Sequence, residues 1–144
     1  MLSQKNKYAI KALLYLAQLP KGERAKTADI SKAAHIPKKF LELILLELKR
    51  AQMVASKQGV QGGYYLLKKP EEISLIDVFR LIDGPIALLP CASLKFYEPC
   101  EDCQQEEACR LRWALIEIRN QTLAILEKIS LKTMLDQKTE ELIL

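Results

Sequence analysis

The chain is poor in the residues that build turns and large sheets. Its 144 residues include 5 glycines, 6 prolines and 6% aromatic residues, while 49% of them are hydrophobic. This composition predicts a mainly helical fold with an ordinary core and little β-structure. No run is long and apolar enough to span a membrane, and Lys5, Lys7 and Lys11 interrupt the apolar pattern that a signal peptide needs. We therefore expect a cytoplasmic protein without a membrane partner, whose thiols stay reduced.

The chain also lacks the usual combinations of catalytic residues. Its single histidine, His35, leaves no Ser/His/Asp set, and no glycine-rich phosphate-binding loop opens a helix. Cys100 and Cys103 form a C-x-x-C pair, but no thioredoxin-like βαβ pattern surrounds them. We therefore do not expect an enzyme.

Positive charge is concentrated in the first half of the chain. Residues 1–69 hold 14 Lys/Arg against 4 Asp/Glu, net +10, whereas residues 70–144 hold 8 against 14, net −6. A basic half is suited to a phosphate backbone, because each Lys or Arg near DNA releases condensed counterions. An ordinary solvated surface can also be this basic, so only the sequence motifs can distinguish a DNA-binding surface from it.

Apolar spacing in the basic half predicts two helices in sequence. Over residues 3–19, apolar side chains recur at three- and four-residue steps, and residues 20–22 (Pro-Lys-Gly) end the pattern. A short second helix follows, with Thr27 as its N-cap and an end near His35.

A third helix completes a helix-turn-helix pattern. Pro37 suits its first position, where a missing N–H loses no hydrogen bond. Its N-terminal turn carries Lys38, Lys39 and Glu42, which would meet base edges if this is a recognition helix. The alternative is an ordinary helical bundle with a basic loop. The predicted buried stripe comprises Phe40, Leu41, Ile44, Leu45 and Leu48.

A hairpin follows directly and favours a winged helix over that alternative. Residues 53–57 and 64–68 are strand-like and flank a glycine-rich turn, whose glycines allow positive φ and a close approach of backbone to DNA. Residues 1–70 are therefore predicted to form a winged helix-turn-helix DNA-binding region. The DNA-binding candidates are Thr27, Lys38, Lys39, Glu42, Lys57, Gln58, Gln61, Gly62, Gly63 and Tyr64.

Residues 71–109 should link this region to a sensor. Ser74 is predicted to cap a linker helix that stops at Asp83, within residues 71–90. The loop at residues 91–109 holds all four cysteines. Thiolates select iron-sulfur clusters or zinc, and a metal can order a loop that has no core of its own. Metal-free thiols, or a disulfide between Cys100 and Cys103, are the other possibilities. The metal-ligand candidates are Cys91, Cys100, Cys103 and Cys109.

The last third of the chain predicts one long helix, from about Glu106 to Leu135. A second apolar set, Ile116, Leu123 and Leu126, accompanies its main stripe, so we expect residues 110–135 to form a homodimerisation helix. A purely intramolecular core helix is the alternative. Residues 136–144 form a polar tail expected to fray. The main, heptad-like stripe comprises Leu111, Leu115, Ile118, Thr122, Ile125 and Ile129.

The order of these parts resembles the Rrf-type (IscR/NsrR-like) family of winged-helix transcription regulators over nearly the whole chain. The matching pieces are residues 8–13 (Tyr-Ala-Ile-Lys-Ala-Leu), residues 56–64 (Ser-Lys-Gln-Gly-Val-Gln-Gly-Gly-Tyr), and residues 73–78 (Ile-Ser-Leu-Ile-Asp-Val) ahead of Asp83 and Gly84. The resemblance implies a homodimer that binds a palindromic operator in double-stranded DNA. It also implies an iron-sulfur cluster, held in many members on three cysteines before the long helix.

The chain departs from the family pattern in its wing and in its ligands. Gln58 stands where the family usually has arginine, so minor-groove contact is expected to fall to Lys57. Four cysteines stand where three are usual. Cys103 and Cys109 keep the spacing of three-cysteine members, and Cys91 and Cys100 are both candidates for the remaining ligand. Lys7 and Arg112 occupy places where some members carry a non-cysteine ligand, and this favours completion by the fourth cysteine.

Together these features predict a DNA-binding transcription regulator whose operator binding is modulated by a cysteine-ligated iron-sulfur cluster or a thiol redox site. The alternative is a zinc-stapled DNA-binding or protein-interaction module without redox sensing.

Overall fold

The computed structural model of the chain describes residues 2–138. Its helices are α1 (Gln4–Ala17), α2 (Thr27–Ala34), α3 (Lys38–Arg50), α4 (Leu75–Ile82), α5 (Arg110–Lys128) and α6 (Leu131–Asp136), and its strands are β1 (Val54–Lys57) and β2 (Gly63–Leu66). Short 3₁₀ turns lie at η1 (Pro70–Glu72), η2 (Pro90–Ala92) and η3 (Glu106–Ala108). The predicted mainly helical fold with one hairpin is confirmed.

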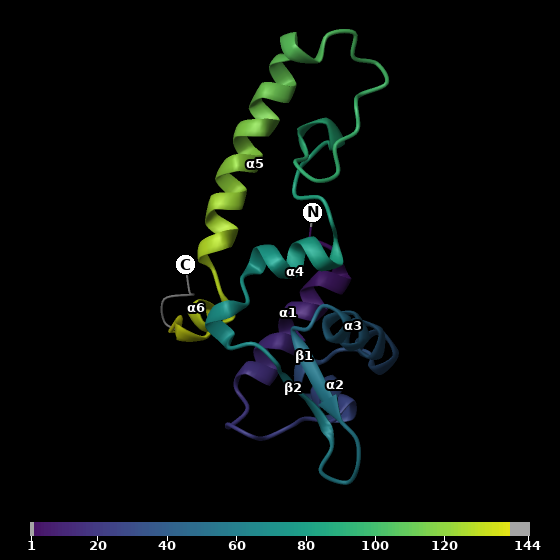
Figure 1. Ribbon diagram of the computed structural model, residues 1–144, viewed down its shortest axis with the longest axis vertical. Coiled ribbons are helices and arrows are strands. Elements are labelled where there is room, and N and C mark those ends of the chain that lie inside the picture. The colour runs from purple at the N-terminus through teal and green to yellow at the C-terminus, as the bar shows by residue number, and fades with distance from the viewer. Residues whose placement is uncertain (1, 139–144) are drawn as a thin grey trace.

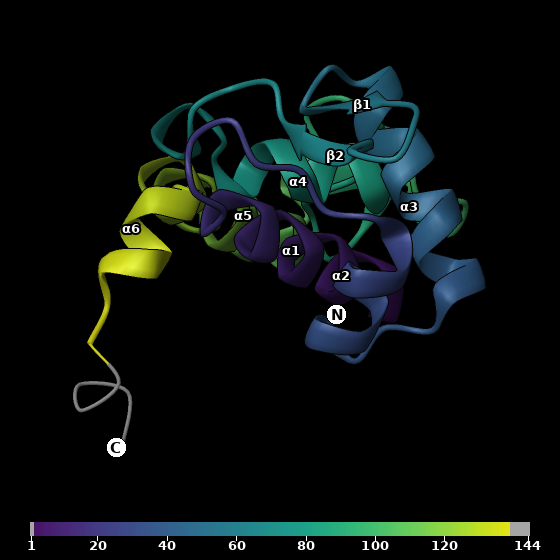
Figure 2. The same cartoon turned by 90° about the horizontal axis from the view of Figure 1, so that it is seen from below.

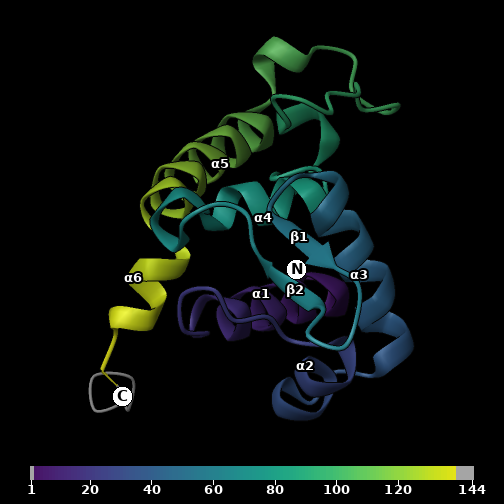
Figure 3. The same cartoon turned by 60° about the horizontal axis from the view of Figure 1, so that its bottom comes forward.

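The elements form a compact lower part and a projecting upper part (Figure 1). The lower part contains α1 to α3, the hairpin and α6. The upper part contains α5 and the irregular segment that leads into it from α4. Figure 3 shows α5 and this segment at the end of the molecule opposite α2. The basic half of the chain and the cysteine-containing segment therefore lie at different ends of the molecule.

Helix α1 is the centre of the lower part, where it packs against α2, α3, α4, α6 and β2. Ala9, Ala12 and Leu13 on its inner face are fully buried. Small side chains at two of these positions let neighbouring helices approach closely, while each fully buried leucine contributes about 1.5–3 kcal/mol.

The helix-turn-helix forms with small shifts in its predicted boundaries. Lys26, not Thr27, is the N-cap of α2, because its backbone is extended and its carbonyl accepts from the Ile30 N–H at 3.1 Å. Pro37 likewise precedes α3 as its N-cap and is not its first residue. His35 ends α2 in the left-handed conformation, with φ 53°, and so turns the chain towards α3.

The prediction of one helix from Glu106 to Leu135 is wrong, because the chain breaks between α5 and α6. Ile129 and Ser130 are extended, and Ser130 pairs with Ser74 in an isolated antiparallel bridge. The Leu75 N–H donates to the Ile129 carbonyl at 2.8 Å, and the Leu131 N–H donates to the Ile73 carbonyl at 3.0 Å. This pairing with a distant segment satisfies backbone groups that a continuous helix would have bonded internally.

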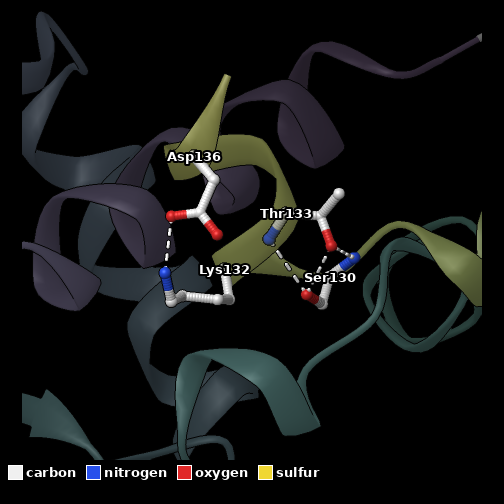
Figure 4. A network of polar contacts seen from close by, with 4 residues as sticks. All are labelled: Ser130, Lys132, Thr133 and Asp136. Atoms are coloured by element: carbon white, nitrogen blue, oxygen red, sulfur yellow. Dashed lines mark hydrogen bonds and ion pairs between the residues drawn. The ribbon is translucent and has the colours of Figure 1, made fainter. Parts of the chain in front are cut away.

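Local side chains support the same break (Figure 4). Ser130 Oγ accepts from the Thr133 N–H at 3.1 Å, which caps the start of α6. Lys132 pairs with Asp136 one turn later. Leu131 is 1% exposed, so α6 returns to the core of the lower part.

No helix among residues 2–138 is long and apolar enough to cross a membrane. From position 139 onward, the tail predicted over residues 136–144 lies outside the described residues.

Candidate DNA interface and cysteine site

The N-terminal turn of α3 presents its predicted residues to solvent. Lys38, Lys39 and Glu42 are exposed, while Leu41 and Ile44 on the opposite face are buried. Their exposure follows from the helical period, which places positions 38, 39 and 42 away from the core. The turn is therefore available to a partner.

Phe40 was wrongly predicted as buried, because it is 49% exposed and meets the Tyr8 ring edge-on with the centroids 6.2 Å apart. Leu43 and Leu46 on the same helix are 61% and 41% exposed, a feature that sequence reasoning missed. The exposed face of α3 is thus part basic and part apolar.

The hairpin forms a wing in the predicted place. Its strands pair antiparallel, from Val54 opposite Leu66 to Lys57 opposite Gly63. Lys57, Gln58 and Gln61 are exposed at the tip. The wing therefore offers a cation and two amides to solvent.

The wing glycines are required by contacts within the chain. A Cβ on Gly62, which is itself buried, would lie 2.4 Å from the Lys57 carbonyl oxygen. A Cβ on Gly63 would lie 2.6 Å from the Ala25 carbonyl oxygen, and the φ of Gly63 is +141°. Only Gly59 combines positive φ with open space around it among the wing glycines. Close backbone packing therefore accounts for Gly62 and Gly63.

The connection between α1 and α2 is part of the wing structure, which the sequence did not indicate. Ala25 forms an isolated antiparallel bridge with Tyr64, with N–H···O distances of 3.0 and 2.7 Å. Figure 2, seen from below, shows this connection running beside β2 on its way to α2. The bridge fixes the wing against the start of α2.

A surface hollow of about 400 Å³ lies between the start of α2 and the wing. The structure therefore brings six predicted DNA-binding residues together, while Lys38, Lys39, Glu42 and Gln61 do not line this hollow. Its lining includes Thr27, Lys57, Gln58, Gly62, Gly63 and Tyr64.

The four cysteines lie in two neighbouring pairs within the segment between α4 and α5. Cys91 is 3% exposed in η2, and the other three thiols are partly exposed. Hydrogen bonding with Cys91 raises the pKa of Cys100 to about 11, with burial adding to the effect. Partial burial, with Cys109 close by, raises the pKa of Cys103. All four are free thiols.

The donor chemistry of this segment fits a thiolate-ligated metal group. The raised pKa values of Cys100 and Cys103 come first from the hydrogen bond with Cys91 and from partial burial, and the neighbouring sulfurs add to them by repulsion, which a bound cation would remove. Among residues 2–138, however, no group of three or more Cys, His, Asp or Glu side chains is arranged to hold a metal ion. The thiols thus lie in two pairs, Cys91 with Cys100 and Cys103 with Cys109. These two pairs would have to approach each other to hold one metal group.

Backbone and arginine contacts attach this segment to α5. Cys109 is the N-cap of α5, and its Sγ accepts from the Arg112 N–H at 3.3 Å. Arg112 Nε donates to the Cys91 carbonyl at 3.0 Å, and Arg119 Nη1 donates to the Ala92 carbonyl at 2.5 Å. Arg112, at a position where the resemblance implies a ligand in some members of the family, therefore holds the Cys91 turn to the helix.

The start of the same segment is attached to α1. Ser3 Oγ and Ser3 N–H both donate to the Asp83 carboxylate, and Asn6 Nδ2 donates to it at 2.8 Å. Partial burial raises the pKa of Asp83, but these hydrogen bonds outweigh it and hold the pKa below its ordinary value. A charged Asp83 therefore joins the end of α4 to the start of α1.

The two predicted apolar stripes of α5 are only partly buried. Leu115 and Leu126, one from each predicted stripe, are its buried residues. Leu111, Ile118 and Ile125 recur every seven residues on one face and are 60%, 48% and 58% exposed. Burial within the chain therefore leaves an apolar face of α5 open.

Comparison with known proteins identifies the arrangement. A family model described as "Rrf2: Iron-dependent Transcriptional regulator" matches residues 2–137. An rrf2-like putative HTH-type transcriptional regulator of Rhodobacter capsulatus is 45% identical over 138 residues, covering 94% of this chain and 92% of that protein. The HTH-type transcriptional regulator NsrR of Geobacillus kaustophilus is 30% identical over 137 residues, covering 95% and 90%.

Among solved structures, CymR, the global cysteine regulator of B. subtilis, has a TM-score of 0.75 and 27% identity, covering 93% of this chain and 95% of that one. The winged helix, the linker helix and the projecting helix thus recur together in a characterised architecture. The chain belongs to the Rrf2 family of DNA-binding transcriptional regulators, which are not enzymes.

Proposed function

We propose that this regulator binds a palindromic operator as a homodimer, and that the state of its four cysteines controls the binding. The observation that carries the proposal is the position of the cysteine pairs, between the linker helix α4 and the exposed helix α5. A change there acts on the element best placed to join two copies.

The proposed DNA contacts are the exposed N-terminal turn of α3 and the wing. Lys38, Lys39 and Glu42 would face the major groove, with Lys57, Gln58 and Gln61 at the wing tip. Thr27, Gly62, Gly63 and Tyr64 line the hollow beside the wing, where backbone and hydroxyl groups can meet phosphate.

The proposed dimer contact is the open face of α5 formed by Leu111, Ile118 and Ile125. Three large apolar residues at heptad spacing are typical of a helix that packs on another helix. Pairing through α5 would set the distance between the two recognition helices.

The proposed sensor group is an iron-sulfur cluster held by Cys91, Cys100, Cys103 and Cys109, in keeping with the iron dependence in the family's description. Such a group supplies a reversible change of charge, or its own loss, in response to redox conditions. The residues of the chain transmit the change: Arg112 and Arg119 hold the Cys91 turn to α5, so movement of that turn reaches the helix directly.

The first test is the metal content of the full chain purified without oxygen. Coloured protein that contains iron and acid-labile sulfide, and that loses both when all four cysteines are changed to serine, supports the cluster. Colourless protein containing zinc would instead support a zinc-stapled module, and colourless metal-free protein would leave only thiol chemistry. Either result contradicts a cluster.

The second test is the response of DNA binding, measured on a duplex selected from a random library with the wild-type chain. The wild-type affinity should differ between anaerobic and air-exposed protein, and the four-serine variant should lose this difference. Glu98→Gln, an exposed change in the same segment, is the matched control and should respond as the wild type does. An unchanged response in the four-serine variant contradicts sensing by the cysteines.

A further inference from the structure

The connection between α1 and α2 carries an arginine to the wing. Arg24 Nη1 donates to the Gln61 carbonyl at 3.2 Å, and its guanidinium lies over the Tyr65 ring, 5.7 Å from the centroid. The bridge between Ala25 and Tyr64 holds the adjacent backbone in place. Two side-chain contacts and a backbone pair thus hold the Arg24 guanidinium beside the wing tip, although Arg24 and the wing lie far apart in the sequence.

Within residues 2–138, no ion pair neutralises the charge of this guanidinium. The ion pairs formed by residues 2–138 join Lys5 to Glu47 and Lys132 to Asp136, and neither involves Arg24. A carbonyl and an aromatic face position a guanidinium without cancelling its charge. The remaining N–H groups of Arg24 therefore stay available for an anion.

The surroundings of Arg24 also favour an anion. A hollow of about 400 Å³ between the α1–α2 connection and the wing is lined by Lys21, Arg24, Lys57 and Lys68, with Glu23 as its single acidic residue. Lys57 also lines the second hollow, on the α2 side of the wing. The two hollows thus meet at the wing, which itself carries Lys57 as its one cation over residues 54–66.

We propose that Arg24 is a DNA-contacting residue whose guanidinium binds a backbone phosphate beside the wing. The inference rests on the proposed contact of the wing with DNA and adds a contact from outside the hairpin. A planar guanidinium with parallel N–H groups matches a phosphate better than an ammonium does. Because Arg24 also bonds the Gln61 carbonyl, binding a phosphate would fix the wing tip on the duplex.

The test is the affinity of full-length variants for the selected duplex over a series of salt concentrations. Arg24→Ala should bind about tenfold more weakly near 0.1 M salt, and the slope of log affinity against log salt should fall by about 0.9, the value of one phosphate contact. The loss should be similar for unrelated duplexes, because a phosphate contact carries no base information.

Two further variants separate charge from wing geometry. Arg24→Gln keeps an amide that can donate to the Gln61 carbonyl but has no charge, so it should bind as weakly as Arg24→Ala. Arg24→Lys keeps the charge and should fall between Arg24→Ala and the wild type. Wild-type affinity and salt slope in Arg24→Gln would overturn the proposal, because the arginine would then serve the wing structure alone.

Controls distinguish failure of this inference from failure of the DNA interface. Lys128→Ala removes an exposed cation on α5 and should leave the salt slope unchanged. Lys38→Ala and Lys57→Ala should weaken binding if the proposed interface is right. If they do so while Arg24→Ala does not, the inference on Arg24 alone is wrong; if none of the three has an effect, the interface itself is wrong. Thermal unfolding by circular dichroism checks that each variant is folded.

Discussion

The docking of α6 on the lower part gives a prediction with a calculable size. Leu131 is 1% exposed and belongs to the same core as α1 and α3, although it follows the projecting helix in sequence. Replacing a buried leucine by alanine typically costs about 2–5 kcal/mol, through lost burial and the cavity that remains. For a chain of this size, Leu131→Ala should therefore lower the unfolding temperature by roughly 6–20 °C.

The measurement is urea or thermal unfolding followed by circular dichroism at a fixed protein concentration, because the proposed dimerisation would make apparent stability depend on concentration. Lys132→Ala is the matched control on the same helix. It removes an exposed ion pair with Asp136, whose contribution is about 0–1 kcal/mol. If Leu131→Ala is no more destabilising than Lys132→Ala, then α6 is not docked as described and the break between α5 and α6 has lost its physical basis.

Three further predictions concern contacts that hold the wing and α4. Gly63→Ala should distort the wing, because the added Cβ meets the Ala25 carbonyl at 2.6 Å; we expect a lower unfolding temperature and weaker DNA binding in titrations. The lowered pKa of Asp83 means that its charge stabilises the fold above its unfolded pKa, near 3.8, and that this stabilisation is lost as the pH falls through the folded pKa. Asp83→Asn should remove that loss in unfolding experiments below about pH 4. Ser74→Ala removes the Oγ bonded to Asp77 at 2.7 Å at the start of α4, and should cost about 0.5–2 kcal/mol in urea unfolding.

Local patterns in the sequence predicted much of the lower part. The three- and four-residue spacing in α1, the proline before α3 and the glycines between two strand-like runs each report on a neighbourhood of a few residues. The structure has these elements within a few residues of their predicted bounds. Side-chain periodicity is sufficient there because the same core buries one face of each element.

Contacts between distant segments could not be predicted in the same way. Ile129 fits the heptad stripe of α5, so nothing local indicates that the helix stops beside it; the stop depends on pairing with Ile73 and Leu75. Arg24 likewise has no motif of its own and becomes notable only when Gln61 and Tyr65 come close. The pairing of Cys91 with Cys100, in preference to the C-x-x-C pair, also depends on how the loop folds back.

These distant contacts fix both ends of α4 to the lower part of the molecule. Its start pairs with the break between α5 and α6, and Asp83 at its end accepts hydrogen bonds from Ser3, the N-cap of α1, and from Asn6 in α1. Helix α5 packs on α4 and has Cys109 as its N-cap, so a change at the cysteines should turn α5 about the break and leave the lower part undistorted. With 19 residues at about 1.5 Å each, α5 is about 28 Å long, and a displacement of about 5 Å at its first turn corresponds to a rotation of about 10°. Because the proposed dimer contact lies along this helix, such a rotation would reorient the two recognition helices as rigid bodies, and operator affinity would respond through half-site spacing.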